Sequence, residues 1–134
     1  MAKVITLGMG KGGVGKTTTT MMLCDSLCDM GYKVLGVDFD PQGNFTQMTT
    51  RKSLFDFEDR TVLEAMEAVD PVPYITKISE HFDLLPADDY LAYLSKYLYK
   101  EREGNPYTCL DETLAPIRNN YDFIIIDLPP NLGD

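Results

Sequence analysis

A glycine-rich run near the start of the chain, residues 8–18, constrains the fold more than any other feature. From Gly10 to Thr17 it reads G-x-x-x-x-G-K-T, the pattern of a phosphate-binding loop. Glycines let the backbone fold back so that successive N–H groups point at one phosphate chain. The pattern requires a strand before the loop and a helix after it, and residues 3–8 and 17–30 are predicted to supply them. A glycine-rich turn without a ligand is the alternative interpretation, and it would not require this order.

The residue types at the end of the loop predict how a nucleotide would be held. At the start of the helix, N–H donors and the positive end of the dipole face the same anion. Lys16 can reach the β- and γ-phosphates, and the Thr17 hydroxyl can bind Mg²⁺. The residues expected to contact the nucleotide are Gly10, Lys11, Gly12, Gly13, Val14, Gly15, Lys16, Thr17 and Thr18.

Two acids end the next predicted strand, residues 33–40. This strand, the helix before it and the first strand form a βαβ unit, so its two strands are expected to be parallel. Asp38 and Asp40 would then lie at the edge of the sheet where the phosphate loop also lies, with both side chains on one side. Acids in that place suit Mg²⁺ or an attacking water. Residues 40–44, Asp-Pro-Gln-Gly-Asn, also suit a turn, and the two interpretations are compatible.

A third acid closes the clearest strand of the chain, residues 121–127. Its continuous apolar run is typical of a central parallel strand that is covered on both faces. Asp127 at its end is expected to hold Mg²⁺ through water, as the usual partner of a phosphate loop. The sequence therefore predicts an α/β fold of the P-loop NTPase type: a doubly wound, mainly parallel sheet with helices on both faces.

The other predicted elements follow from local signals. Thr61 and Glu64 have the spacing of a capping box and predict the start of a short helix. Pro116 is expected to kink or split the last helix. The predicted elements are a short helix and loop within 45–60, a helix over 61–69, a short extended piece around 74–78, a strand over 82–86, a helix over 88–102 and a helical stretch over 109–119.

Composition limits the class of protein. The 134 residues fit one domain, and the net charge of −9 works against non-specific contact with nucleic acid or anionic membrane. No apolar run approaches the length of a membrane span, and the chain enters a strand directly after its first residues, so we expect a cytoplasmic protein without a membrane partner. The basic residues are dispersed, and we expect no appreciable DNA binding by this chain alone.

The three cysteines are Cys24, Cys28 and Cys109, with no C-x-x-C pair. An odd number without that spacing argues against a disulfide scaffold. Cys24 and Cys28 lie four apart on the predicted first helix and so share a face. We expect both thiols to pack as small apolar groups, in preference to a zinc site completed by His81.

Three segments together resemble the ParA/MinD family of deviant Walker ATPases. They read K-G-G-V-G-K-T-T over 11–18, D-F-D-P-Q-G-N over 38–44 and D-L-P-P over 127–130. In order and spacing they are similar to the phosphate loop and the two switch segments of that family, and most similar to the Soj-like ParA branch. The family usually has a small residue at the place of Leu128, which puts the packing of the second switch in doubt but not the metal role of Asp127.

The resemblance implies roles for individual residues. Lys11 would cross a dimer interface to the nucleotide of the partner subunit, and Asp40 would orient the hydrolytic water. Asp38 would support the loop and the metal shell. The resemblance thus implies catalytic roles for Lys11, Lys16 and Asp40, metal binding by Thr17, Asp38 and Asp127, and ATP with Mg²⁺ as cofactors. The choice of ATP over GTP follows from the family alone.

The resemblance also implies a function: a weakly hydrolysing Mg-ATP-binding ATPase that acts as a nucleotide-gated dimerisation switch in plasmid or chromosome partitioning. Such a switch would have a ParB-like partner. Family members usually continue for a comparable length, so residues 1–134 correspond to the N-terminal portion of the usual domain. Three alternatives stay open: a non-enzymatic nucleotide-dependent regulator or scaffold, a MinD-like ATPase, and a metal-cluster carrier, which would need paired bridging cysteines.

Overall fold

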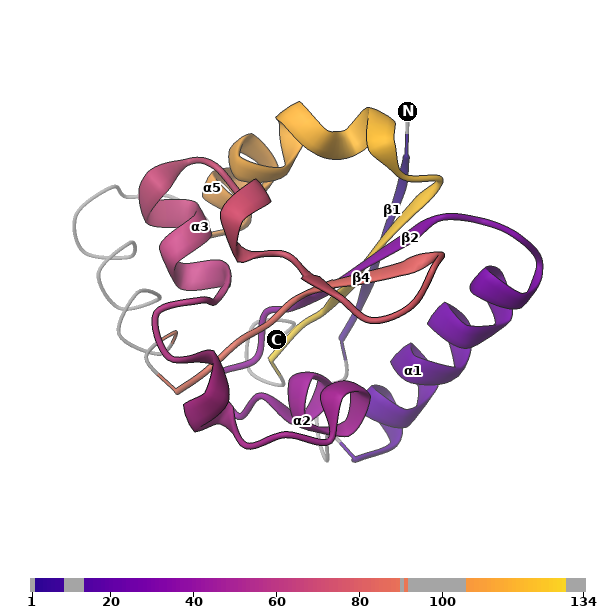
Figure 1. The fold of residues 1–134 in the computed structure, drawn as a ribbon, viewed down its shortest axis with the longest axis horizontal. Helices are drawn as coiled ribbons and strands as arrows, with labels where there is room; N and C mark the ends of the chain where they lie inside the picture. Colours follow the sequence, from indigo (N-terminus) through magenta and orange to yellow (C-terminus); the bar gives the residue numbers. More distant parts are fainter. Residues whose placement is uncertain (1, 9–13, 90, 92–105, 130–134) are drawn as a thin grey trace.

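The computed structural model describes residues 2–8, 14–89, 91 and 106–129. These residues include a five-stranded sheet (Figure 1). The strand order is β1-β5-β2-β4-β3. Their bounds are β1 (Lys3–Leu7), β2 (Val34–Asp38), β3 (Thr76–Lys77), β4 (Phe82–Leu85) and β5 (Phe123–Asp127). Neighbouring strands are parallel except for β3, which pairs antiparallel with β4 at one edge. The predicted mainly parallel, doubly wound sheet is confirmed.

Helices cover both faces of this sheet (Figure 1). On one face lie α1 (Val14–Asp29) and α2 (Asn44–Thr50). On the other lie α3 (Val62–Ala68), α5 (Pro106–Leu114) and the 3₁₀ helix η3 (Ala115–Asn120). Two short 3₁₀ helices, η1 (Leu54–Phe57) and η2 (Val72–Tyr74), join α2 to α3 and α3 to β3. The helix predicted over 88–102 falls almost entirely outside the described residues. No helix in the described part of the chain has the length and apolar character needed to span a membrane.

A glycine two residues after helix α1 helps to end it. Gly31 has a φ of +91°, which favours glycine. Its N–H donates to the Cys28 carbonyl at 2.9 Å, and the Tyr32 N–H donates to the Leu27 carbonyl at 3.1 Å. This pair of hydrogen bonds is a recurrent way of satisfying the last carbonyls of a helix. It ends α1 and turns the chain toward β2.

Two other local predictions are confirmed. The Thr61 hydroxyl accepts from the Leu63 N–H at 3.2 Å, and the Glu64 carboxylate accepts from the Thr61 N–H at 2.9 Å, which is the capping box at the start of α3. The last helical stretch is split as expected: α5 ends at Leu114, and η3 begins beside Pro116, whose nitrogen cannot donate. Helix α5 starts at residue 106, three residues before the predicted start at 109.

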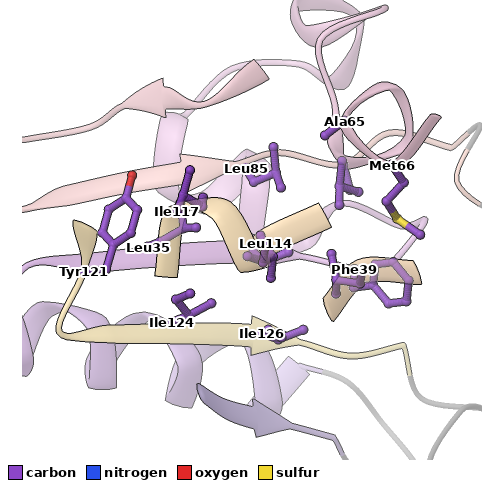
Figure 2. Packing of buried hydrophobic residues seen from close by; sticks show 14 of the residues in the cluster. Leu35, Phe39, Ala65, Met66, Leu85, Leu114, Ile117, Tyr121, Ile124 and Ile126 are labelled. Atoms are coloured by element: carbon purple, nitrogen blue, oxygen red, sulfur yellow. The ribbon is translucent and has the colours of Figure 1, made fainter. Parts of the chain in front are cut away.

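The larger core lies between the sheet and the layer of α3, α5 and η3. Figure 2 shows Leu35, Ile124 and Ile126 of the sheet together with Leu114 and Ile117 of the covering helices. Because these strands carry apolar side chains on both faces, the sheet is buried from both sides. The burial holds the strand ends in fixed positions relative to each other.

Gly36 in the middle of β2 determines how closely α2 approaches the sheet. A Cβ at this position would lie 2.7 Å from Cζ of Phe45 and 3.1 Å from Cε1 of Phe82. Phe45, fully buried in the first turn of α2, therefore occupies the space that a side chain at position 36 would need. This packing holds the segment between β2 and α2 against the sheet.

Candidate functional site

The carboxyl ends of three strands meet at one edge of the sheet. In the register of the parallel pairs, Asp127 at the end of β5 lies opposite Leu7 of β1 on one side and Asp38 of β2 on the other. The phosphate-loop segment follows β1, and α1 begins at the same edge. Since ligands of open α/β sheets bind outside the carboxyl ends of the strands, this edge is the candidate site.

Lys16 is the central cation of the site. It is only 2% exposed, and its Nζ lies 3.4 Å from Oδ2 of Asp40 and 3.5 Å from Oδ2 of Asp127. It also donates to the carbonyl oxygen of Leu128. A buried ammonium needs such partners to offset the loss of water. Residues from three separate parts of the chain therefore meet at one charge.

Asp127 is fully buried, and its two oxygens have different partners. Oδ1 accepts from the Thr20 hydroxyl at 2.8 Å, and Oδ2 lies 3.4 Å from the Thr17 hydroxyl. Burial raises the pKa of Asp127, while Lys16 and the hydrogen bond from Thr20 lower it. The carboxylate and the Thr17 hydroxyl are hard oxygen donors of the kind that suits Mg²⁺, which usually takes one or two protein carboxylates and completes its shell with phosphates and water. These residues fit the predicted metal.

Asp38 is also fully buried, and hydrogen bonds engage both of its oxygens. Oδ1 accepts from the Asp40 N–H at 3.1 Å, and Oδ2 accepts from the N–H and the hydroxyl of Thr46 at 2.8 and 2.7 Å. Burial raises the pKa of Asp38 to about 7, against the lowering effect of the Thr46 hydrogen bonds. The carboxylate thus ties both ends of the segment 40–46 to β2. Its predicted metal role stays a prediction, and the contacts support its predicted role in holding the loop.

Asp40 begins a turn. Its Oδ1 accepts from the Gln42 N–H at 3.0 Å, and its carbonyl accepts from the Gly43 N–H at 2.8 Å. Gly43 has a φ of +64°, which favours glycine. The turn interpretation of residues 40–44 is confirmed, and it leaves Oδ2 of Asp40 directed to Lys16.

Several predicted site residues lie outside the described residues: Gly10, Lys11, Gly12 and Gly13. Val14 and Gly15 open α1.

The prediction that the two cysteines of α1 pack as small apolar groups is confirmed, since Cys24 is buried in the core of that face and Cys28 packs against it. Across the residues that the structure describes, no cluster of three His, Cys, Asp or Glu side chains could hold a metal ion. A metal at this edge would therefore depend on the few oxygens described above, with phosphate and water.

Thr20 and Thr46 are site residues that were not predicted from the sequence. A signal existed for Thr20, because it lies four positions after Lys16 and three after Thr17, and so shares their face of α1. No comparable signal existed for Thr46. Its hydroxyl also accepts from the Ala87 N–H at 2.9 Å, which links α2 to the segment after β4.

A cavity of about 490 Å³ lies beside the turn and is lined in part by Pro41 and Gln42. Its other lining residues come from α2, from η1 and the residues that flank it, and from the segment after β4, and they include the acids Glu58, Asp88 and Asp89. Lys16 and Asp127 do not line it. It is therefore separate from the candidate site, although both share the turn after Asp40.

Comparison with known proteins gives a family match. The family model described as "AAA domain" matches residues 2–134. Among curated proteins, the chromosome-partitioning ATPase Soj of Treponema pallidum is 35% identical over 134 residues, which are 99% of this chain and 51% of Soj.

Solved structures of similar proteins have the same fold as this chain. Cobyrinic acid a,c-diamide synthase from Mycobacterium smegmatis, with bound ADP and magnesium, is 33% identical with a TM-score of 0.86, over 98% of this chain and 53% of that one. A variant of McdA from Cyanothece in complex with ATP is 30% identical with a TM-score of 0.83, over 96% of this chain and 48% of that one. The chain spans about half the length of the relatives it matches.

Proposed function

Because this chain belongs to the AAA domain family and, within it, to the ParA-type deviant Walker ATPases, we propose that it binds Mg²⁺-ATP and hydrolyses it slowly. The observation that carries the proposal is the convergence of Lys16, Asp40 and Asp127 at one edge of the sheet. Residues 1–134 would form one P-loop nucleotide-binding domain.

We propose a task for each residue that agrees with its contacts. Lys16 would bind the β- and γ-phosphate oxygens, and Thr17 and Asp127 would hold Mg²⁺, which neutralises charge on those oxygens. Phosphate oxygens would compete with Asp40 for the Lys16 ammonium, because Asp40 Oδ2 lies only 3.4 Å from it. Asp40, released from that ion pair, would be able to accept a hydrogen bond from the attacking water and so orient it. Asp38 would hold the Asp40 segment in place through the hydrogen bonds at both of its oxygens.

The biological role that we propose is nucleotide-gated homodimerisation in plasmid or chromosome partitioning, in the cytoplasm and with a ParB-like partner. The name of the Treponema relative, a chromosome-partitioning ATPase, supports this role. Lys11 would contact the nucleotide of the partner subunit. That assignment rests on the family resemblance, because Lys11 lies outside the described residues.

Calorimetric titration with ATP, ADP and GTP in the presence of Mg²⁺, followed by a phosphate-release assay, tests the enzymatic proposal. We expect binding of ATP and ADP in preference to GTP, and slow release of phosphate. Absence of ATP binding would remove the proposal. Binding without any phosphate release would favour the regulator or scaffold.

Light scattering with a non-hydrolysable ATP analogue tests the dimer. We expect the wild-type chain and Lys52→Ala, which alters an exposed lysine, to dimerise with the analogue. Lys11→Ala should bind it as a monomer. A Lys11→Ala protein that still dimerises would contradict the cross-subunit role.

Fluorescence anisotropy with duplex DNA at low salt tests the expectation that this chain alone does not bind DNA.

A further inference from the structure

Thr20 makes a contact with Asp127 that the proposed mechanism has not used. It is fully buried on α1, and its Oγ1 lies 2.8 Å from Oδ1 of Asp127, 107 positions further along the chain. Its Oγ1 also lies 2.9 Å from the carbonyl oxygen of Lys16. Thr20 therefore connects the helix that carries Lys16 and Thr17 to the acid at the end of β5.

The Thr20 hydroxyl has one hydrogen and two possible acceptors. A carboxylate is a stronger acceptor than a neutral carbonyl, because the hydrogen bond is charge-assisted. The Lys16 carbonyl also lies in the backbone hydrogen-bonding pattern of α1. The hydroxyl is thus best used as a donor to Asp127.

This donor decides how the carboxylate of Asp127 is turned. The terminal torsion of an aspartate is broad, so the side chain alone does not fix which oxygen faces which neighbour. With Oδ1 held by Thr20, Oδ2 faces the Thr17 hydroxyl at 3.4 Å and the Lys16 Nζ at 3.5 Å. Both contacts are longer than ordinary hydrogen bonds. Oδ2 is therefore the less tightly held oxygen, and it points toward the residues that would surround a phosphate.

We propose that Thr20 is a positioning residue that fixes the carboxylate of Asp127 with Oδ2 presented toward Thr17, where Mg²⁺ would be held. The inference rests on the proposed function, because it concerns the metal that accompanies the nucleotide. Valine at position 20 would fill the same volume but would leave Oδ1 without its donor. The carboxylate would then be free to turn toward Lys16, and Mg²⁺ would bind more weakly while the phosphate contacts stayed in place.

The experiment measures binding of a fluorescent ADP analogue at increasing Mg²⁺ and in EDTA. Thr20→Val should need about 10-fold more Mg²⁺ for the half-maximal gain in affinity, in line with the loss of one hydrogen bond to a charged group. Its affinity in EDTA should stay within about twofold of wild type, and Thr20→Ser should restore the normal Mg²⁺ dependence. If Thr20→Val does not fold, Thr20→Ala replaces it.

Thr19→Val is the matched control. The Thr19 hydroxyl donates to the carbonyl four residues earlier, that of Gly15 at 2.8 Å, on the exposed side of α1. It should keep the wild-type Mg²⁺ dependence. A normal Mg²⁺ dependence in Thr20→Val, or an equal loss in Thr19→Val, would overturn the inference.

A second measurement separates this inference from the proposed function. If the wild-type chain binds no nucleotide, the proposed function fails, and crystal structures of Thr20→Val and Thr20→Ser without nucleotide decide about Thr20. We expect the Asp127 carboxylate to be turned in Thr20→Val and to keep its wild-type orientation in Thr20→Ser. The wild-type orientation in both variants would refute the positioning role.

Discussion

Lys16 and Asp40 form a buried ion pair, with Nζ 3.4 Å from Oδ2, between the helix after the phosphate loop and the turn after β2. Their side chains are 1% and 6% exposed. Two charges this deeply buried depend on each other, because removal of one leaves the other uncompensated. If phosphate takes the place of Asp40 at the ammonium, substitution of the two residues should have opposite effects on nucleotide binding.

Lys16→Ala should lower the affinity for Mg²⁺-ATP by about 10- to 100-fold, because it removes a charge-assisted contact to phosphate. Isothermal titration calorimetry checks this, with Lys52→Ala as a control for the loss of one exposed positive charge. Circular dichroism should show that the variant is folded. Equal affinities for wild type and Lys16→Ala would contradict the assignment of the site.

Asp40→Ala should bind Mg²⁺-ATP at least as tightly as wild type, because the competitor for Lys16 is gone. Phosphate release should fall by about 10²- to 10⁴-fold if Asp40 orients the water, the usual range for a group that assists proton transfer. Asp56→Ala, which alters an exposed acid on η1, should release phosphate at the wild-type rate. An Asp40→Ala protein with normal turnover would place the water-orienting group elsewhere.

Gly36→Ala should destabilise the fold by about 1–3 kcal/mol, the usual cost of overpacking a core. The added methyl group would meet the Phe45 ring at 2.7 Å. Urea denaturation measures the loss, and Phe45→Leu in the same chain should recover part of it, since residues in contact do not act additively. If the losses of stability from the two substitutions are fully additive, Phe45 does not limit the size of the side chain at position 36.

Burial raises the pKa of the Cys24 thiol to about 12. At pH 8 its thiolate fraction is then on the order of 10⁻⁴, so iodoacetamide should label Cys24 only after unfolding in urea. The linkage has a definite sign. Since the folded pKa lies above the unfolded value near 9, the stability that Cys24 contributes below pH 9 should be lost as the pH rises from 9 to 12. Rapid labelling of Cys24 in the folded chain would contradict its burial.

The parts of the fold and of the site that could be predicted have signals within a short stretch of sequence. Asp127 closes an apolar run, the capping box at Thr61 spans four residues, and Lys16 ends a fixed pattern of glycines. Each was found because the physical cause and its consequence lie close together along the chain.

The parts that could not be predicted depend on distant partners. The Thr20 hydroxyl bonds an acid 107 positions away, and the Thr46 hydroxyl accepts from an N–H 41 positions away. In the sequence, Thr20 is the last of four consecutive threonines, and its helical spacing from Lys16 and Thr17 gives its face of the helix but not its acceptor.

The position of β5 in the sheet has a consequence for how the protein reaches its native state. Within the described residues, β1 pairs only with β5, and β5 separates it from β2. The first strand can therefore pair only with a strand about 120 residues later in the chain. Such non-local pairing is slow, because the loop-closure entropy is lost before the contacts form. During synthesis, a ribosome-bound chain that has not yet exposed residues 123–127 cannot join β1 to the sheet. The edge that carries Lys16 and Asp127 would assemble among the last events of folding.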